Sequence, residues 1–151
     1  MQIKKPTLNN IKDIQKVVMP YVEEGIILKR DDDEVATNIR SYIIVYDKNE
    51  PIGIAALHIF SPILGEIRSL AVKKEYQGKG VGKKIVEYLL EEAKKLGLKE
   101  VLALTYKKEF FEKLGFIEIE KEKVPDKKIW ADCIKCKFFP NCNEIALIKY
   151  L

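Results

Sequence analysis

One stretch of this chain decides its fold: Gln77-Gly78-Lys79-Gly80-Val81-Gly82. A strand-like segment, residues 66–72, precedes it, and a helix-like segment with apolar residues at three- and four-residue steps follows it. Glycine lets backbone amides approach a ligand closely and adopts conformations that other residues avoid. At the start of a helix, unpaired N–H groups and the helix dipole favour a phosphate or pyrophosphate. The stretch therefore predicts a phosphate-binding loop between a strand and a helix.

This stretch departs from two common phosphate-binding motifs. A Walker loop ends in Gly-Lys-Ser/Thr, but no hydroxyl residue follows the last glycine here. A dinucleotide fingerprint has two residues between its second and third glycines, where this chain has one. The pattern Gln77-x-x-Gly80-x-Gly82, with Glu66-Ile-Arg-Ser-Leu-Ala-Val72 before it and Phe110-Phe-Glu-Lys-Leu-Gly-Phe116 after it, resembles the signature of the GCN5-related N-acetyltransferases (GNAT). The alternative is a glycine-rich turn that only joins strand to helix.

The resemblance implies an α/β protein with the GNAT fold, in which a central mixed, mostly antiparallel sheet is flanked by helices. Residues 1–151 would form a single N-acetyltransferase domain. In that family the glycine loop holds the pyrophosphate of acetyl-CoA, the co-substrate, and no metal is required. The pantetheine arm pairs with the end of the preceding strand, where this strand and the strand at residues 101–105 splay apart. The residues expected to bind acetyl-CoA are Leu70, Ala71, Val72, Gln77, Gly78, Lys79, Gly80, Val81, Gly82, Lys83 and Phe111.

Length and composition favour one globular domain. The 151 residues suffice for a hydrophobic core, and the net charge of +4 is dispersed. This charge suits a small anionic ligand, and it is weak evidence for nucleic acid. The N-terminus lacks the apolar segment of a signal peptide, and no run is long enough to span a membrane. We therefore expect a cytoplasmic protein without nucleic-acid or membrane partners. Because dimers are common in the GNAT fold, a homodimer is compatible with the resemblance.

Local patterns predict most elements of the fold. Asn9 is expected to cap a helix that runs to about residue 21, and Gly97 to end the helix after the glycine loop. Alternation along residues 65–72 would place Glu66 and Arg68 on one face, unless a bulge of the kind usual in the family redirects the later residues. The apolar stripe of the first helix comprises Ile11, Ile14, Val17, Val18 and Tyr21. The other expected elements are strands at 3–7, 42–46, 51–60, 100–105, 116–124 and 144–151, and short helices at 32–41 and 108–114.

Acetyl transfer to an amine needs a base, because an ammonium group has no lone pair for the attack. The resemblance assigns this role to Glu66; the alternative is a carboxylate that only pairs with Arg68 or a nearby lysine. The tyrosine that commonly acts as the acid in the family is replaced by Phe111, and a phenyl ring cannot donate a proton. Tyr106 is a substitute candidate for the general acid, with water, or a role in the pocket wall, as the alternatives.

Several blocks between about residues 25 and 150 resemble the short, single-domain N-acetylglutamate synthases. They include Gly25-Ile-Ile-Leu-Lys-Arg30, Leu104-Thr-Tyr-Lys-Lys-Glu-Phe-Phe111 and Trp130-x-Asp-Cys133. The implied reaction transfers acetyl from acetyl-CoA to the α-amine of L-glutamate, the first step of arginine biosynthesis. Two carboxylates require cations with hydrogen-bond donors. The candidates are Arg30, Arg68 and Lys107; the alternative for each arginine is a surface side chain without a ligand.

Two other functions stay open at this point. The chain could acetylate another amine, such as a protein N-terminus, a lysine or a polyamine, or it could be a non-catalytic acetyl-CoA-binding module. The module is suggested by the missing tyrosine and by Cys133, Cys136 and Cys142, in a loop at about residues 130–143. These thiols could be reduced structural groups, ligands of zinc or an iron–sulfur cluster, or partners in a disulfide. Because no fourth Cys or adjacent His exists, no metal site is assigned.

Overall fold

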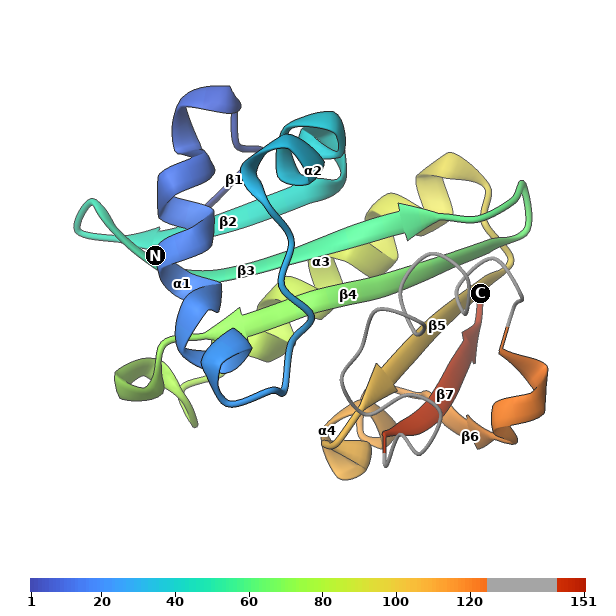
Figure 1. The fold of residues 1–151 in the computed structure, drawn as a ribbon. Coiled ribbons are helices and arrows are strands. Elements are labelled where there is room, and N and C mark those ends of the chain that lie inside the picture. The colour runs from blue at the N-terminus through green and yellow to red at the C-terminus, as the bar shows by residue number, and fades with distance from the viewer. Residues whose placement is uncertain (125–143) are drawn as a thin grey trace. The chain divides into compact units, whose positions relative to one another are not determined.

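The computed structural model of this chain describes residues 1–124 and 144–151, which form two compact units. The first unit comprises Met1–His58 and Ile67–Glu91, and the second Ile59–Glu66 and Glu92–Leu151. Seven strands follow the order β1-β2-β3-β4-β5-β7-β6 in a mixed sheet (Figure 1). The expected α/β class, with a mixed and mostly antiparallel sheet flanked by helices, is confirmed.

The first unit contains the antiparallel strands β1 (Gln2–Lys4), β2 (Tyr42–Asp47) and β3 (Glu50–Ile59). A tight turn joins β2 to β3, and both of its central residues, Lys48 and Asn49, have positive φ, at 50° and 67°. This conformation matches the right-handed twist of the two strands that it connects. The strands expected at residues 42–46 and 51–60 are thus present and joined by this turn.

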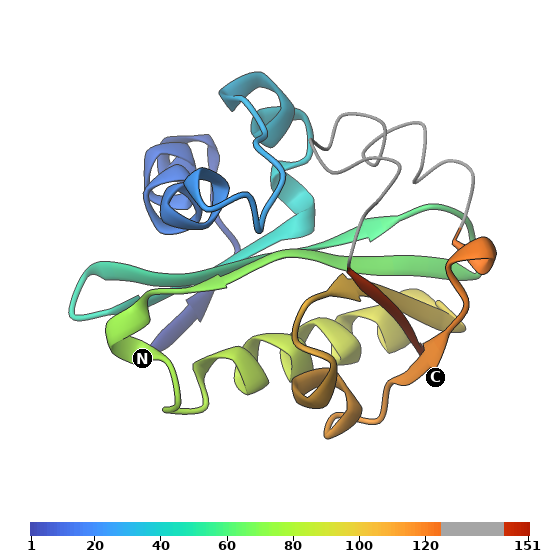
Figure 2. The same cartoon turned by 60° about the horizontal axis from the view of Figure 1, so that its bottom comes forward.

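Helices α1 (Ile11–Glu23) and α2 (Asp32–Thr37) cover one face of these strands, and α3 (Val81–Leu96) begins on the opposite face (Figure 2). The close approach of α3 depends on a glycine, because a Cβ atom at Gly53 of β3 would lie 2.9 Å from Cδ1 of Ile85. Burial of apolar side chains from α1, α2 and the strands is the main source of stability for this unit. The core on the α1 and α2 side consists of Ile14, Val17, Val18, Val35, Tyr42, Ile44, Ile54, Ala56 and Ala71.

The start of α1 differs from the expectation, because Thr7 rather than Asn9 is the capping residue. Thr7 caps a 3-10 turn, Leu8–Asn10, and its hydroxyl accepts a 3.3 Å hydrogen bond from the N–H of Asn9. In return, the side-chain oxygen of Asn10 accepts a 2.8 Å hydrogen bond from the N–H of Thr7. This reciprocal capping box satisfies the donors at the helix start. Asn9 therefore lies inside the turn, and β1 ends at Lys4 instead of residue 7.

Strand β4 (Leu64–Val72) contains a local irregularity at Ser69, whose φ is +58°. A positive φ is uncommon for serine, and it interrupts the alternation of side chains between the two faces of a sheet. Glu66, Ile67 and Arg68, which precede it, are buried in succession, as in a strand that is covered on both faces. Simple alternation therefore does not describe this strand.

The second unit contains β5 (Glu100–Thr105), β6 (Ile117–Ile119) and β7 (Ile145–Tyr150). Strand β7 lies between the other two and is antiparallel to both. The first part of β4, residues 64–66, pairs in parallel with residues 100–102 of β5. Helix α3 thus lies in the crossover between two parallel strands, and β6 and β7 form an antiparallel pair.

The connection from β5 to β7 is less regular than expected. Helix α4 (Lys108–Glu112) is shorter than the predicted helix over residues 108–114, and Gly115, with a φ of +94°, then reverses the chain. The strand predicted over residues 116–124 is limited to β6, because the chain turns into a 3-10 helix at Lys121–Lys123. Alternating apolar residues marked the start of this strand, but they did not reveal where its pairing with β7 ends.

Candidate active site

The glycine loop joins β4 to α3 within the first unit. Gly78 and Gly80 have φ angles of +77° and +82°, in the left-handed region that glycine enters without strain. The carbonyl of Gly80 accepts the first helical hydrogen bond, from the N–H of Lys84 at 3.1 Å. The N–H groups that follow Gly80 are those that an α-helix leaves without carbonyl partners in its first turn. The loop thus presents backbone donors at the positive end of a 16-residue helix, an arrangement suited to a phosphate group.

Gln77, the first residue of the loop signature, is held by α1 and by the end of β4. Its Nε2 donates a hydrogen bond to the hydroxyl of Tyr21 and another, at 3.4 Å, to the carbonyl of Val72. The Tyr21 hydroxyl in turn donates to the same carbonyl at 2.5 Å. Tyr21 was expected only as a member of the apolar stripe. Its polar role was missed because Val72 lies 51 residues further along the chain.

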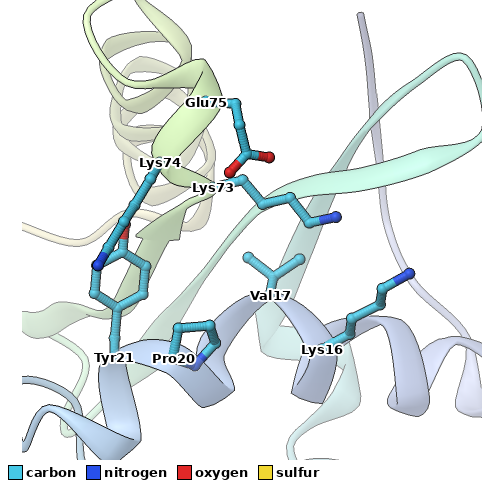
Figure 3. A pocket seen from close by; sticks show the side chains of 7 residues that line it. All are labelled: Lys16, Val17, Pro20, Tyr21, Lys73, Lys74 and Glu75. Carbon is cyan, nitrogen blue, oxygen red and sulfur yellow. The ribbon is translucent and has the colours of Figure 1, made fainter.

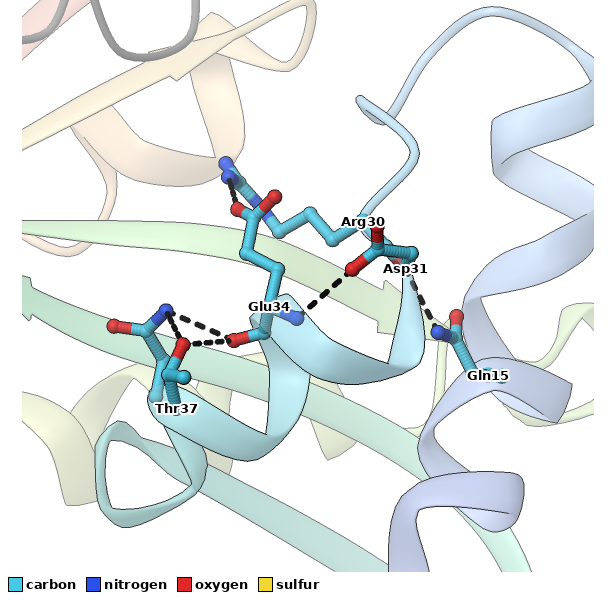
Figure 4. Close-up of polar contacts among 6 residues, drawn as sticks. Gln15, Arg30, Asp31, Glu34 and Thr37 are labelled. Atoms are coloured by element: carbon cyan, nitrogen blue, oxygen red, sulfur yellow. Dashed lines mark hydrogen bonds and ion pairs between the residues drawn. The ribbon is translucent and has the colours of Figure 1, made fainter.

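Arg30 and Arg68 are both buried within the first unit, with exposed fractions of 7% and 9%. Arg30 directly precedes α2, and its Nη1 lies 2.6 Å from Oε2 of Glu34 in an ion pair (Figure 4). The carbonyl of Arg30 accepts a 2.8 Å hydrogen bond from Nε2 of Gln15 on α1. The alternative of surface arginines is therefore wrong for both residues, whereas the third arginine, Arg40, is exposed.

Tyr42 of β2 lies within electrostatic range of both buried arginines. Burial raises the pKa of its phenol because the phenolate would lose its hydration, and the positive charges of Arg30 and Arg68 act in the opposite direction. The side chain of Ser69, at the irregularity of β4, also acts to lower the pKa of Tyr42. Segments far apart in sequence thus bring two guanidinium groups to one buried phenol. The carboxylate of Glu34, already paired with Arg30, also acts on this phenol, so the three groups together carry one net positive charge, which suits an anionic group.

The other candidates for the chemical step belong to the second unit. Glu66 is 1% exposed and pairs in register with Leu102 of β5. Tyr106 is 43% exposed at the end of β5, and Lys107 is also exposed. The N–H of Lys107 donates a 2.8 Å hydrogen bond to Oγ1 of Thr105. Of these groups, only the carboxylate of Glu66 lies in the low-dielectric environment that tunes a catalytic base.

Phe111, at the position of the expected tyrosine, packs inside the second unit. It is 4% exposed, and its ring makes edge contacts with Phe110 and Phe116 at centroid separations of 5.0 and 5.1 Å. Such edge-to-face aromatic contacts add to the stabilisation from burial. Phe111 therefore has a packing role, and a contact with acetyl-CoA stays a prediction.

A pocket of about 310 Å³ lies in the first unit beside α1 (Figure 3). Two of its lysines are already paired with carboxylates, Lys73 with Glu50 at 2.5 Å and Lys74 with Glu24 at 2.8 Å. None of the site residues predicted from the sequence lines it. The lining residues are Lys16, Val17, Pro20, Tyr21, Lys73, Lys74 and Glu75.

The three cysteines considered as metal ligands, Cys133, Cys136 and Cys142, lie outside the described residues. Within residues 1–124 and 144–151, no group of three or more His, Cys, Asp or Glu side chains is arranged to hold a metal ion. In the same part of the chain, every helix is too short or too polar to cross a membrane.

Comparison with known proteins identifies the family. Residues 8–116 match the profile of the acetyltransferase (GNAT) family. An uncharacterised N-acetyltransferase of Chlorobaculum tepidum is 37% identical over 149 residues, which cover 99% of this chain and 96% of that protein. This chain belongs to the GNAT family of acetyltransferases, as its loop signature predicted.

More distant relatives have named activities. The amino-acid acetyltransferase of Escherichia coli is 28% identical over 129 residues, but these residues make up only 29% of that enzyme. A similar solved structure is N-acetylglutamate synthase from Neisseria gonorrhoeae, complexed with coenzyme A and N-acetyl-glutamate. Its TM-score is 0.86 at 25% identity, and the match covers 99% of this chain and 35% of that chain. A Mycobacterium tuberculosis protein in complex with coenzyme A has a TM-score of 0.85 at 25% identity, and covers 100% of this chain and 99% of its own. Coenzyme A in these neighbours agrees with acetyl-CoA as the expected co-substrate.

Proposed function

We propose that this protein transfers an acetyl group from acetyl-CoA to the α-amine of L-glutamate. The observation that carries the proposal is the set of charged side chains buried in the described residues, which consists of Arg30, Glu66 and Arg68. Burying a charge costs free energy, so buried ionic groups with polar surroundings are candidates for function. Two guanidinium groups suit a dicarboxylate, and one carboxylate suits an amine that must lose a proton.

The comparisons support the acceptor. The Escherichia coli relative is an amino-acid acetyltransferase, and the Neisseria gonorrhoeae neighbour holds N-acetyl-glutamate beside coenzyme A. The relative with 37% identity has no assigned acceptor. The proposal of glutamate therefore depends on the buried arginines as well as on these likenesses.

In this proposal the glycine loop, residues 77–83, holds the pyrophosphate of acetyl-CoA, and the end of β4, residues 70–72, pairs with its pantetheine arm. Glu66 accepts a proton from the ammonium group of glutamate, directly or through water. The amine lone pair then attacks the thioester carbonyl, the C–S bond breaks, and coenzyme A leaves as a thiolate that Tyr106 or water protonates. Arg30, Arg68 and Lys107 bind the two carboxylates of glutamate.

Two alternatives have their own predictions. An acetyltransferase for a polyamine or a lysine side chain would bring a cationic acceptor toward the buried arginines, and like charges at close range are unfavourable. A non-catalytic module would bind acetyl-CoA without releasing the coenzyme A thiol. Thiol release measured with glutamate, aspartate, glutamine, lysine, spermidine and a short peptide separates the three functions. The proposal expects release with glutamate, and a preference for any cationic amine would contradict it.

Arg30 allows a sharper test of the acceptor. We expect Arg30→Ala to raise the KM for glutamate about tenfold or more, because charge-assisted hydrogen bonds contribute roughly 1.5–3 kcal/mol. The KM for acetyl-CoA should change much less. Arg30→Lys should recover only part of the loss, since an ammonium group does not form the two-pronged contact of a guanidinium.

The matched control for this test is Arg40→Ala, because Arg40 is exposed. Its KM values should match those of the wild type. Replacing Arg30 also removes the partner of Glu34, so thermal unfolding must be measured for each variant. Equal increases in the KM for both substrates of a folded Arg30→Ala protein would refute the assignment.

A further inference from the structure

Tyr21 connects three segments of the first unit through a single hydroxyl group. It donates a hydrogen bond to the carbonyl of Val72 at 2.5 Å and accepts one from Nε2 of Gln77. The hydroxyl of Tyr21 is thus the donor in one hydrogen bond and the acceptor in another, as a phenol allows. A phenol keeps its proton at neutral pH, and burial raises the pKa of Tyr21 further, so the hydroxyl is a donor.

The carbonyl that Tyr21 holds is at a defined edge of the sheet. The N–H of Lys73 donates to the carbonyl of Ile52 in β3 at 2.8 Å. The carbonyl of Val72 belongs to the same peptide group, and in a trans peptide the C=O and N–H point in opposite directions. The Val72 carbonyl therefore points away from β3. Tyr21 and Gln77 both donate to this carbonyl, the last of β4.

The backbone of Tyr21 holds a second segment. Its carbonyl accepts hydrogen bonds from the N–H groups of Ile26 and Ile27 at 2.9 and 3.2 Å. These residues begin the loop that leads to Arg30. One residue of α1 thus holds the end of β4, the first residue of the glycine loop and the start of the segment that carries a buried arginine.

We infer that Tyr21 is a positioning residue for acetyl-CoA, which aligns the end of β4 with the glycine loop through its hydrogen bonds to Val72 and Gln77. The inference rests on the proposed placement of acetyl-CoA, but not on glutamate as the acceptor. A pantetheine arm on β4 and a pyrophosphate at the loop must be bound at a fixed separation, and this phenol joins the two segments. We expect that removal of the hydroxyl keeps the backbone hydrogen bonds within each segment but removes the link that fixes one segment relative to the other.

The test compares two tyrosines that have the same number of side-chain hydrogen bonds. Tyr46 donates to Oδ2 of Asp13 at 2.6 Å and accepts from Nδ2 of Asn10 at 3.3 Å. Burial and the Asp13 carboxylate raise the pKa of Tyr46 to about 12, and the bond from Asn10 acts in the opposite direction. Its contacts join the α1 region to β2, and neither of its two partners belongs to the glycine loop. Tyr21→Phe should raise the dissociation constant of coenzyme A, measured by titration calorimetry, about three- to tenfold, the range for a lost hydrogen bond. Tyr46→Phe should leave this constant unchanged while lowering the unfolding temperature.

A second variant tests whether Tyr21 acts through Gln77. Gln77 is exposed, so Gln77→Ala should fold, and it should weaken coenzyme A binding to a similar extent. If the two residues act through the same hydrogen bond, the double variant Tyr21→Phe/Gln77→Ala should bind coenzyme A no more weakly than the weaker-binding single variant. An unchanged dissociation constant in Tyr21→Phe, an equal increase in Tyr46→Phe, or additive losses in the double variant would each overturn the inference. Failure of the glutamate proposal alone would leave these binding results unaffected, because coenzyme A is titrated without an acceptor.

Discussion

Burial removes most of the hydration of the Glu66 carboxylate, so its charge depends on the polar groups around it. A buried carboxylate of this kind is a candidate general base, whereas a fully solvated one at the surface is a weak base. The same residue lies three positions before Ser69, where β4 loses its regular alternation. At the scale of single residues, a buried charge beside a backbone irregularity is therefore the clearest sign of a site in this chain.

Glu66→Gln should lower kcat by roughly 10²–10⁴-fold, the usual contribution of a positioned acid–base group, with little change in either KM. The carboxamide keeps the shape of the side chain but cannot accept the proton. The matched control is Glu87→Gln, because Glu87 is an exposed carboxylate on α3. Steady-state kinetics are measured for both variants. A folded Glu66→Gln protein with kcat within about threefold of the wild type would exclude Glu66 as the base.

At the scale of elements, α3 has a glycine with positive φ at each end. Gly80 and Gly97 have φ angles of +82° and +91°, and a Cβ at either position would meet no atom within 4 Å. At the C-terminal end, the N–H groups of Leu98 and Gly97 donate to the carbonyls of Ala93 and Lys94 at 3.0 and 3.1 Å. This is the Schellman arrangement, and it confirms the expected end of the helix at Gly97.

Gly80→Ala and Gly97→Ala should each lower the free energy of unfolding by about 1 kcal/mol, because alanine disfavours the left-handed conformation. Only Gly80→Ala should also raise the KM for acetyl-CoA, by about tenfold, since it disturbs the backbone donors at the start of α3. Denaturant unfolding and steady-state kinetics measure the two effects separately. An equal KM for both variants would mean that the glycine loop does not contact acetyl-CoA.

The elements that the sequence predicted well are those with local causes. Gly97 and the apolar period of α3 act within a few residues, so both the helix and its end could be foreseen. The length of β6 depends on pairing with β7, about thirty residues later in the chain, and local alternation overestimated it. In the candidate site, too, local motifs could be predicted and long-range contacts could not. The motif predicted a binding role for Gly80 and Gln77, which stays a prediction, but the polar role of Tyr21 depends on a partner 51 residues away and was not foreseen.

At the scale of the whole molecule, the positive net charge of the chain acts on anionic ligands. The net charge is +4 at pH 7, and acetyl-CoA carries several phosphate charges. Exposed lysines also belong to the glycine loop and the first turn of α3, where Lys79, Lys83 and Lys84 are at the surface. Such a field attracts an anionic ligand over distances comparable to the Debye length, about 10 Å at 0.1 M salt.

We therefore expect kcat/KM for acetyl-CoA to fall severalfold as potassium chloride is raised from about 0.02 to about 0.5 M, because salt screens this attraction. The kcat at saturating acetyl-CoA should change little, since screening weakens the encounter with the ligand and not the reaction of the bound complex. Acetyl-pantetheine has the same thioester but no phosphate, so its kcat/KM should be nearly independent of salt, at a lower absolute value. The pair of donors separates screening of the phosphates from any general effect of salt on the protein. The same salt dependence with both donors would show that the positive charge of the chain does not act on the phosphates of acetyl-CoA.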